Sequence, residues 1–539
     1  MNESIKEDSI KERNSFSKLF SNIKFQILSI FLAAVIIRIY FTPFELPITL
    51  DGAQYFWYAV DTSILGKFPD GYDFPNNGWP VLLSLVFNIS NPDTFLDFHI
   101  IQRLSSIIIS AATVIPIYLL CKRFFDIKIA ILGTCIFVFE PRLLINSVSG
   151  LPESLFIFLF TFSIYLFLSN NFKKIYIAFA LIAILSLIRY EGFLLIFPFS
   201  LLLFFKFKKN KKNILKYILA IIIFSIILLP IMNLRTETMG GDGILDQISA
   251  QSTFYQSDEV TNMKFDTQDS FEEKIIKGIT SMIKLLGWQM IPYLVFFIPV
   301  GIIFFFKNFN LNRKIIFILT FVMLIPAFYA FSRDFSEMKY LFIMMPILTI
   351  ISLSFIEKIS KKIRHKNLLI FLLIIGIIFT SFIFLEDRKI DDNYEMEAYK
   401  IGIKISSITD VINDYDPESV YVDEKIAEAT ILEKFPVLFS NVPKQITLIQ
   451  GLNGGEIKGC QTCYEAKSLN SFLNSARNNG LEYLLVDDNS KRPQFMKDIL
   501  KNEENYRFLE KVYDSEEDGF QYNVKIFKIN YEKFDNIRK

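Results

Sequence analysis

Net charge, histidine and cleavage signals are all scarce in this sequence of 539 residues. The 57 Lys and Arg residues nearly balance the 56 Asp and Glu residues, and the formal net charge of +1 argues against a nucleic-acid binder. Only two histidines are present, which restricts the zinc sites that the chain can build. No cleavable signal peptide is evident, because residues 1–24 are highly charged and no small-residue cleavage site follows the first apolar run. We therefore expect that run to remain as a membrane anchor.

Apolar residues, by contrast, are abundant. They make up 52% of the chain, which contains 58 Phe, and the mean hydropathy is +0.36. This composition predicts a membrane protein. A bilayer core of about 30 Å requires about 20 apolar residues in a helix. The sequence accordingly predicts about eleven spans, near residues 25–41, 99–120, 128–145, 152–169, 175–188, 193–206, 214–234, 281–306, 315–331, 341–357 and 367–385.

The distribution of basic residues predicts the orientation of these spans. If the N-terminus is cytoplasmic, every inner loop is rich in Lys or Arg: "CKRFFDIK", "NNFKK", "KFKKNKK", "KNFNLNRK" and "EKISKKIRHK". Most of the Asp and Glu then lie outside, in segments 42–98, 140–151, 189–192, 235–280, 332–340 and everything after 385. We therefore predict a multi-pass protein of the cell membrane with a cytoplasmic N-terminus and an extracytoplasmic C-terminal part.

The chain after residue 385 is polar and has a different pattern. Short segments such as "SVYVDE", "QITLIQ", "EYLLVDD" and "YNVKIFKIN" predict strands, and "SLNSFLNSARNNG" and "RPQFMKDILKN" predict intervening helices. The expected domains are a cytoplasmic segment 1–24, a transmembrane domain 25–385 with a large first outer loop 42–98, and an extracytoplasmic α/β domain 386–539. Within that loop, "NNGWPVLLSLVFNIS" predicts a short helix along the membrane interface.

Ionisable residues occur within or at the ends of the predicted spans, where they are costly and by default suggest a function. Under the predicted orientation each lies toward the outer end of its span or in the adjoining loop, so we expect the set to line one outward-facing polar cavity. The alternative is that each side chain extends to the outer headgroups or pairs with a neighbour. That alternative does not explain why the inner halves are almost free of charge. The set is Arg38, Asp51, Arg103, Glu140, Arg142, Glu153, Arg189, Glu191, Arg333, Glu337 and Lys339.

The two chemical types in this set suit group transfer from an anionic lipid. Arg binds phosphate through two parallel hydrogen bonds and keeps its charge. A carboxylate beside it can act as general base on an acceptor hydroxyl. Together they would let a hydroxyl displace a lipid phosphate from a sugar carbon, with the cations stabilising the charge on the departing phosphate.

Six segments carry a resemblance to a known family. They are "LDGAQYFWYA" after the first span, "NNGWPVLLSL" closing the first outer loop, "QRLSSIIISAATVIPIYLLCKRFFD", "PRLLINSVSGLPESLFIFLFTFSIYLF", "LIRYEGFLLIFP" and "SRDFSEMKYLFIMMPIL". In this order, and followed by an external α/β domain, they resemble the GT-C membrane glycosyltransferases, in particular the group of protein O-mannosyltransferases and the aminoarabinose transferase of lipid A. The resemblance implies a polytopic α-helical membrane protein of GT-C type with a C-terminal external α/β domain. It also implies an inverting, mannosyltransferase-like glycosyltransferase that uses a polyprenyl (dolichyl-type) phosphate sugar.

The resemblance also implies roles for individual residues. The family's catalytic acidic residue, which activates the acceptor, falls on Asp51. Tyr55, Trp57 and Tyr58 are expected to anchor the loop at the interface or to stack on a sugar. Arg333 and Lys339 are our choice for the lipid phosphate, and the other predicted substrate-binding residues are Arg103, Glu153, Arg189 and Glu191.

Each assignment has a structural alternative. Asp51 is also a suitable N-cap for a helix that begins at Gly52, and Glu153 would equally favour the positive end of the helix that it starts. For Arg189 and Glu191 the alternative is a structural ion pair, and for Arg333 and Lys339 it is that they are ordinary outer-loop charges. Many relatives have a second acidic residue where this chain has Gly52. Others have a Glu later in the first outer loop, where this chain has "DGYDFPNNGWP" and offers Asp70 or Asp73 instead. We therefore expect no required cofactor and find no support for a divalent metal.

The four cysteines predict no zinc site. Cys460 and Cys463 form a CxxC in the external domain, but His99 and His365 are predicted on opposite sides of the membrane, so two further ligands are lacking. A local disulfide is the better interpretation on an oxidising side of the membrane. Cys121 and Cys135 lie in or near spans and are expected to be unpaired packing residues.

Two other functions compete with the glycosyltransferase. A transporter or lipid flippase would also gather charges in a membrane cavity, but no repeated halves are visible and it needs no external α/β domain. An oligosaccharyltransferase catalytic subunit, a more distant GT-C relative, would carry a WWDYG signature, and none of the three tryptophans begins one. The expected partners are a polyprenyl phosphate sugar, membrane lipids and a protein, lipid or glycan acceptor.

Overall fold

The computed structural model describes most of the membrane part and the end of the C-terminal part. The described residues are 22–48, 51–69, 76–92, 95–207, 214–247, 271–307, 309–333, 335–409, 420–421, 468–477, 483–487 and 494–537. Asp70, Asp73, Cys460, Cys463 and the predicted strand 445–450 lie outside them.

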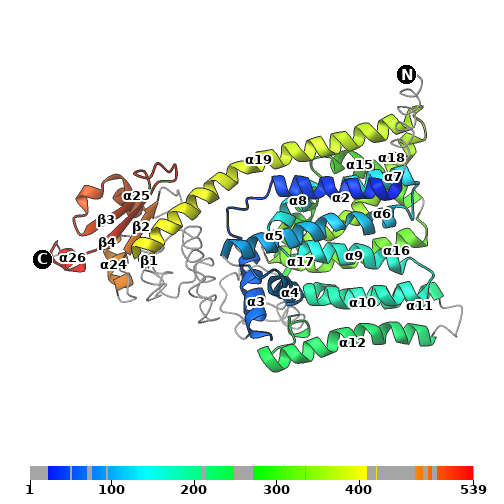
Figure 1. The fold of residues 1–539 in the computed structure, drawn as a ribbon, viewed down its shortest axis with the longest axis horizontal. Coiled ribbons are helices and arrows are strands. Elements are labelled where there is room, and N and C mark those ends of the chain that lie inside the picture. The colour runs from blue at the N-terminus through cyan, green and yellow to red at the C-terminus, as the bar shows by residue number, and fades with distance from the viewer. Residues whose placement is uncertain are drawn as a thin grey trace, which may run out of the picture.

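A bundle of helices forms the membrane part (Figure 1). It contains α2 (Ile23–Tyr40), α5 (Phe95–Ala112), α6 (Val114–Cys121), α7 (Ile127–Val138), α8 (Pro141–Val148), α9 (Glu153–Phe167), α10 (Phe172–Ile188), η1 (Tyr190–Leu195), α11 (Ile196–Phe207), α12 (Ile214–Met239), α14 (Phe271–Gln289), α15 (Leu294–Lys307), α16 (Leu311–Val322), α17 (Leu324–Ser332), η3 (Met338–Met344), α18 (Met345–Ser360) and α19 (Lys366–Thr409).

Seven helical segments among the described residues are long and apolar enough to cross a membrane, and the number is nine if each of two bent pairs forms one span. Each of the eleven predicted segments lies on one or two of these helices or on the shorter α9 and α10. The predicted polytopic α-helical fold is therefore confirmed. Helices α2 and α12 have few buried side chains, and their apolar residues are mostly exposed or half-buried, as expected of a surface against lipid.

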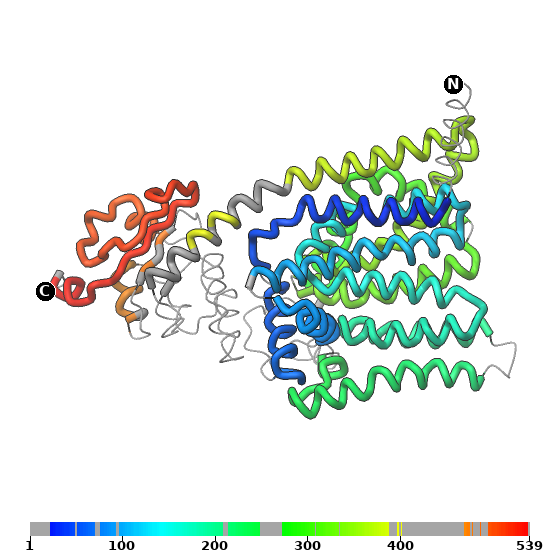
Figure 2. The backbone as a smooth tube through the Cα atoms, viewed as in Figure 1, coloured from blue at the N-terminus to red at the C-terminus, as the bar shows by residue number. Residues whose placement is uncertain are grey.

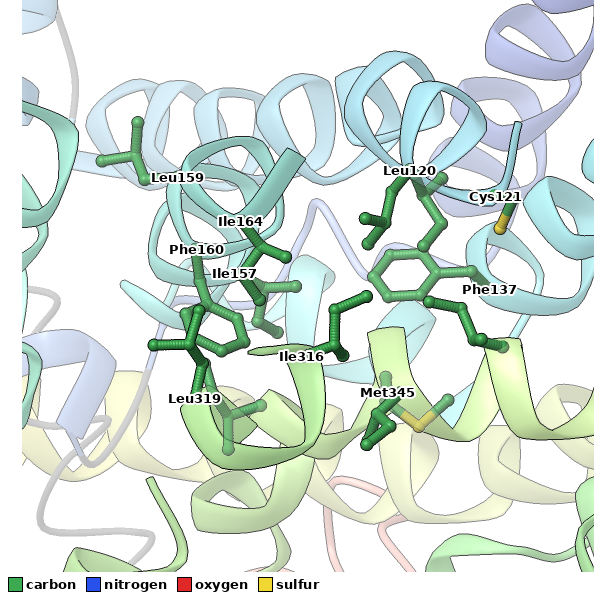
Figure 3. Close-up of a cluster of buried hydrophobic side chains, with 14 of the residues drawn as sticks. Leu120, Cys121, Phe137, Ile157, Leu159, Phe160, Ile164, Ile316, Leu319 and Met345 are labelled. Atoms are coloured by element: carbon green, nitrogen blue, oxygen red, sulfur yellow. The ribbon is translucent and has the colours of Figure 1, made fainter. Parts of the chain in front are cut away.

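The bundle has a continuous apolar core (Figure 3). Leu120 of α6, Phe137 of α7, Phe160 of α9, Leu319 of α16 and Met345 of α18 meet there. Cys121 and Cys135 are buried in the same cluster and are unpaired, as predicted.

Two predicted spans are broken. The span 128–145 bends by 50° between α7 and α8, where Glu140 caps α8 by accepting the Leu143 amide at 2.8 Å and Pro141 takes the first helical position. The segment 281–306, predicted as one span, is two helices at 110° to each other. That prediction was wrong because Pro292 lacks the amide needed to continue α14 into α15.

The first outer loop folds into α3 (Asp51–Leu65) and α4 (Gly78–Ser90), which pack against each other at the end of the bundle nearer to the C-terminal sheet (Figure 1). Trp57 and Tyr58 are buried in this contact together with Trp79. The expectation that Trp57 and Tyr58 reach the interface or a sugar is therefore wrong. Both side chains are buried in the cluster where α3 packs against α4.

Helix α19 leaves the bundle and leads toward the C-terminal sheet (Figure 2). It passes through residue 385, the predicted domain boundary, without a break. The sheet has the order β1-β2-β4-β3, with β1 (Val420–Tyr421) parallel to β2 (Tyr483–Asp487), and β4 (Val524–Ile529) antiparallel to both β2 and β3 (Leu509–Asp514).

Helices α24 (Leu469–Arg477), α25 (Gln494–Lys501), η5 (Glu503–Asn505) and α26 (Tyr531–Ile537) accompany the sheet, and α24, α25 and α26 contribute to its apolar core. A C-terminal α/β domain is thus confirmed. Strand β3 was not predicted, because an irregularity between Lys511 and Tyr513 interrupts its alternation.

Candidate active site

Asp51 forms an ion pair with a residue 288 positions later in the chain. Asp51 is the first residue of α3, and its Oδ2 accepts a hydrogen bond from Nζ of Lys339 in η3. The same ammonium contacts Glu337 Oε2 at 2.5 Å. The Asp51 side chain is 50% exposed, whereas that of Lys339 is 15% exposed. One lysine thus holds two carboxylates, one of which is accessible to an incoming group.

A second, more deeply buried network centres on Arg189, between α10 and η1. Its Nη1 donates to Glu153 Oε1, and its Nη2 and Nε donate to Glu191 Oε1 and Oε2 at 2.8 and 3.4 Å. The predicted Arg189–Glu191 ion pair is therefore present, and Glu153 joins it from the first turn of α9. All three side chains are largely buried, so each charge depends on its partner.

Aromatic rings connect the two networks. The Tyr340 ring lies 5.4 Å from the Arg189 guanidinium and 5.8 Å from the Lys339 ammonium. The Tyr55 hydroxyl accepts a hydrogen bond from Asn76 Nδ2 at 3.2 Å and lies within electrostatic range of Arg189, Glu153 and Asp51. Burial raises the pKa of the Tyr55 phenol and outweighs the opposing charge of Arg189, so the hydroxyl keeps its proton. The structure therefore brings together Asp51, Tyr55, Glu153, Arg189, Glu191 and Lys339.

One face of α5 holds the backbone that leads to Asp51. His99, Gln102 and Arg103 follow the i, i+3, i+4 spacing of a helix face. His99 Nδ1 accepts the Ile48 amide at 2.7 Å, and Gln102 Nε2 donates to the carbonyls of Gly52 and Gly150 at 3.1 and 2.9 Å. Because these contacts lie on either side of Asp51, they fix the start of α3.

Arg103, predicted to bind substrate, also binds the backbone that leads to Asp51. Its Nη1 donates to the carbonyls of Pro43 and Leu46, the latter at 2.7 Å, and its Nη2 donates to that of Pro47 at 3.2 Å. Its side chain is buried behind the loop, so the geometry favours a positioning role over direct contact with phosphate.

Gly52 allows the chain to pass closely behind Asp51. A Cβ at this position would lie 2.3 Å from Ile48 Cγ2 and 3.0 Å from the Ser149 carbonyl oxygen. There is thus no room for the second acidic side chain that many GT-C relatives carry here. Gly78 is similarly close to the backbone of Leu187 and Ile188, where its Cβ would lie 2.8 Å from the Ile188 nitrogen, and so brings α4 against the end of α10 just before Arg189.

Four other charged residues of the predicted set are placed differently. Arg333 ends α17, where it donates to the Tyr329 hydroxyl at 3.0 Å and lies over the Tyr329 and Phe335 rings. Arg38 donates to Ser110, to Ser147 and to the Val138 carbonyl, and Arg142 pairs with Glu140 and donates to the Ile291 carbonyl. Arg38, Glu140 and Arg142 thus stabilise the break between α7 and α8 and form a separate group.

Sequence reasoning missed several residues of the site. Asn76 donates to Tyr55 and accepts the Tyr190 amide at 3.0 Å, yet a lone asparagine in a long loop gives no signal. Tyr340 follows Lys339 directly but reads as part of an apolar run. The i, i+3, i+4 spacing of His99, Gln102 and Arg103 could have predicted that these polar side chains share one face of α5.

A metal site would need several His, Cys, Asp or Glu side chains grouped around one point. No group of three or more His, Cys, Asp or Glu side chains within the described residues is arranged to hold an ion. Asp51 and Glu337 instead share the Lys339 ammonium, and Glu153 binds Arg189. In this arrangement the carboxylates of the site thus contact cationic side chains of the chain itself.

Comparison with protein families then places the chain. A family model described as "Predicted membrane protein (DUF2079)" matches residues 98–410, more than half of the sequence. The chain belongs to the DUF2079 family. A comparison with curated proteins gives no match.

Solved structures identify the fold of this DUF2079 member. The oligosaccharyltransferase of Archaeoglobus fulgidus, in complex with Zn and sulfate, is 13% identical with a TM-score of 0.53, covering 85% of this chain and 68% of its own. The same organism's AglB, in complex with an inhibitory peptide and a dolichol-phosphate, is 12% identical with a TM-score of 0.52, covering 86% and 69%. ArnT of Cupriavidus metallidurans bound to undecaprenyl phosphate is 10% identical with a TM-score of 0.45, covering 93% and 97%. The two archaeal structures show that this DUF2079 member has the GT-C fold, which confirms the resemblance drawn from the sequence at the level of the fold.

Proposed function

We propose that the chain is an inverting glycosyltransferase that moves a sugar from a polyprenyl phosphate to an acceptor hydroxyl on the outer face of the cell membrane. The observation that carries the proposal is the half-exposed Asp51 carboxylate beside Lys339, next to the buried network of Glu153, Arg189 and Glu191. Support for the lipid phosphate comes from a protein of the same fold, the archaeal AglB, whose structure contains a dolichol-phosphate.

In the proposed reaction the acceptor hydroxyl attacks the anomeric carbon of the sugar. Its oxygen forms the new bond to that carbon, and its proton passes to Asp51. The bond between the anomeric carbon and the phosphate oxygen breaks, and the phosphate leaves with the electron pair. Attack from the side opposite the phosphate inverts the configuration at the sugar carbon.

Lys339 is proposed to bind the lipid phosphate and to stabilise the charge on it as it leaves. Arg333, six residues earlier, is proposed as its second cation. A lysine already paired with two carboxylates is suited to this role, because Asp51 and Glu337 hold its ammonium in place before the phosphate arrives. Tyr55, Glu153, Arg189 and Glu191 are proposed to contact the sugar or acceptor, and Arg103 to position the Asp51 loop.

The decisive experiment is turnover of a panel of radiolabelled polyprenyl phosphate sugars by the purified protein in lipid nanodiscs. We expect release of the sugar from at least one donor and a loss of about 100-fold or more in Asp51→Asn, the size expected for removal of a general base. Asp535→Asn is the matched control, since Asp535 is an exposed carboxylate paired with Arg477 in the C-terminal domain. It should leave turnover unchanged.

Two outcomes would contradict the proposal. Equal turnover by the parent and Asp51→Asn would remove Asp51 from the chemistry. No turnover of any donor, together with measurable substrate flux in sealed vesicles, would favour the transporter or lipid flippase.

A further inference from the structure

Glu153 has one carboxylate oxygen for which the described protein residues provide no donor. The residue is 3% exposed and stands in the first turn of α9. Its Oε1 accepts from Arg189, whereas its Oε2 has no hydrogen-bond partner within the part of the chain that the structure describes. Buried carboxylate oxygens are costly to leave without a donor, so this atom requires a partner from outside these residues.

Several neighbouring polar side chains make other contacts. Arg189 directs Nη1 to Glu153 Oε1 and both Nη2 and Nε to Glu191. The Asn76 amide donates to Tyr55, and Ser154, the next residue on α9, shares a hydrogen bond of 2.8 Å with Ser106. None of these groups donates to Glu153 Oε2.

The residues around Glu153 indicate which part of a bound donor would lie next to it. Its charge acts on the Lys339 ammonium and on the Tyr55 hydroxyl, and Lys339 in turn binds Asp51. In the proposed reaction Lys339 marks the phosphate and Asp51 marks the acceptor oxygen. The sugar is the group that is bonded to the phosphate and attacked by the acceptor, and its ring carries several hydroxyl donors.

We propose that Glu153 Oε2 accepts a hydrogen bond from a hydroxyl of the transferred sugar and so selects the sugar of the donor lipid. This inference rests on the proposed function and adds to it a residue that reads the sugar rather than the phosphate. Glu191 provides the contrast, because both of its carboxylate oxygens are paired with Arg189.

The test compares binding of dolichyl phosphate mannose, dolichyl phosphate glucose and bare dolichyl phosphate to the full chain in nanodiscs. In the parent, at least one sugar-bearing form should bind about tenfold or more tightly than the bare lipid phosphate, as expected for a hydrogen bond to a charged group. Glu153→Gln should reduce that preference, the ratio of the affinities for the sugar-bearing and the bare lipid phosphate, about tenfold. Asp535→Asn, which changes an exposed carboxylate paired with Arg477 in the C-terminal domain, is the control and should retain the sugar preference.

A second measurement keeps the inference testable if Glu153→Gln does not fold. Donors that lack one sugar hydroxyl at a time are then compared on the parent protein. We expect removal of one particular hydroxyl to weaken binding about tenfold or more, because a site that uses a hydroxyl leaves a buried acceptor unpaired without it.

The inference would be overturned by equal affinity for sugar-bearing and bare lipid phosphates in the parent, by an unchanged sugar preference in Glu153→Gln, or by equal binding of all single-deoxy donors. These results differ from failure of the proposed function itself, which would appear as no turnover of any donor and no effect of Asp51→Asn.

Discussion

Lys339 forms ion pairs with two acidic side chains of the candidate site. It binds Asp51 from the first outer loop and Glu337 from its own segment, and its ammonium stands near the Tyr340 ring, which also contacts Arg189. Asp51 and Glu337 are each about half exposed, so solvent screens these pairs and their contribution to stability is modest. Their value is geometric, since they hold a cation beside an accessible carboxylate.

Gly52 gives a sharp prediction at the residue scale. In Gly52→Ala the added methyl meets Ile48 and the Ser149 carbonyl, which must move. We expect a loss of about 1–3 kcal/mol in the free energy of unfolding, typical of overpacking, and reduced turnover because Asp51 is the adjacent residue. Thermal unfolding in detergent and the turnover assay measure the two effects.

The control for this change is Gly376→Ala in α19. An added Cβ there has no neighbour within 4 Å, and alanine favours a helix interior by about 0.5–1 kcal/mol over glycine. Equal stability of Gly52→Ala and Gly376→Ala would show that the contact behind Asp51 is not tight.

Helix α14 belongs to a segment that the sequence predicted as one membrane span, yet it has a different direction from α15. It stands at 110° to α15, so if α15 crosses the membrane, α14 runs close to the membrane plane. Met282, Leu285 and Leu286 pack on the α17 and η3 side, next to Tyr340. Ile276, Ile279, Ile283 and Trp288 of the same helix are exposed. Helix α14 therefore has apolar side chains both in contact with the protein and on the surface, as expected of a helix in the membrane interface.

This arrangement predicts that Trp288 is in contact with lipid. Trp288 is 51% exposed, whereas Trp57 and Trp79, the other two tryptophans of the sequence, are buried. In nanodiscs that contain brominated lipids we expect strong quenching of tryptophan emission and loss of most of that quenching in Trp288→Phe. Quenching that persists in Trp288→Phe but is lost in Trp57→Phe would place the lipid contact at α3 instead.

Helix α5 is part of the bundle and also binds the backbone of the candidate site. Its apolar residues belong to the bundle, while His99, Gln102 and Arg103 bind the backbone on either side of Asp51. A single helix thereby connects the rigid membrane core to the candidate active site.

At the scale of the whole molecule, the prediction concerns sidedness. Basic loops lie between the predicted inner ends of the spans, and the C-terminal sheet lies on the same side of the bundle as α3 and α4 (Figure 1). We expect the loop around Lys361 to face the cytoplasm and the C-terminal domain to face outward. Lys361 and Lys533 are suitable reporters, because their side chains are 63% and 55% exposed.

The measurement is labelling of Lys361→Cys and Lys533→Cys with a membrane-impermeant maleimide, in a chain with Cys460 and Cys463 replaced by serine. In intact cells Lys533→Cys should be labelled, and Lys361→Cys should be labelled only after permeabilisation. The reverse pattern would invert the topology and move the candidate site to the cytoplasmic face. The buried Cys121 and Cys135 serve as internal controls that should stay unlabelled.

Much of the fold could be predicted from the sequence because a bilayer imposes a length and an apolar composition on each span. Each of the eleven segments predicted from these local signals is helical in the structure, although some consist of two helices, and the C-terminal strands β1, β2 and β4 were predicted as well. Breaks were harder to predict. The same apolar composition fits a straight span and the bent pair α14–α15, so the bend at Pro292 had to come from the structure.

The sequence by itself determined that this chain is a polytopic membrane protein and that its charges gather toward one side, since hydropathy and charge are properties of short segments. Tertiary structure decided which charges meet. Asp51 and Lys339 are 288 residues apart, and nothing local distinguishes Arg189, which joins Glu153, from Arg38, which stabilises a helix break. That difference arises because a buried charge takes its role from the partners that long-range packing brings to it.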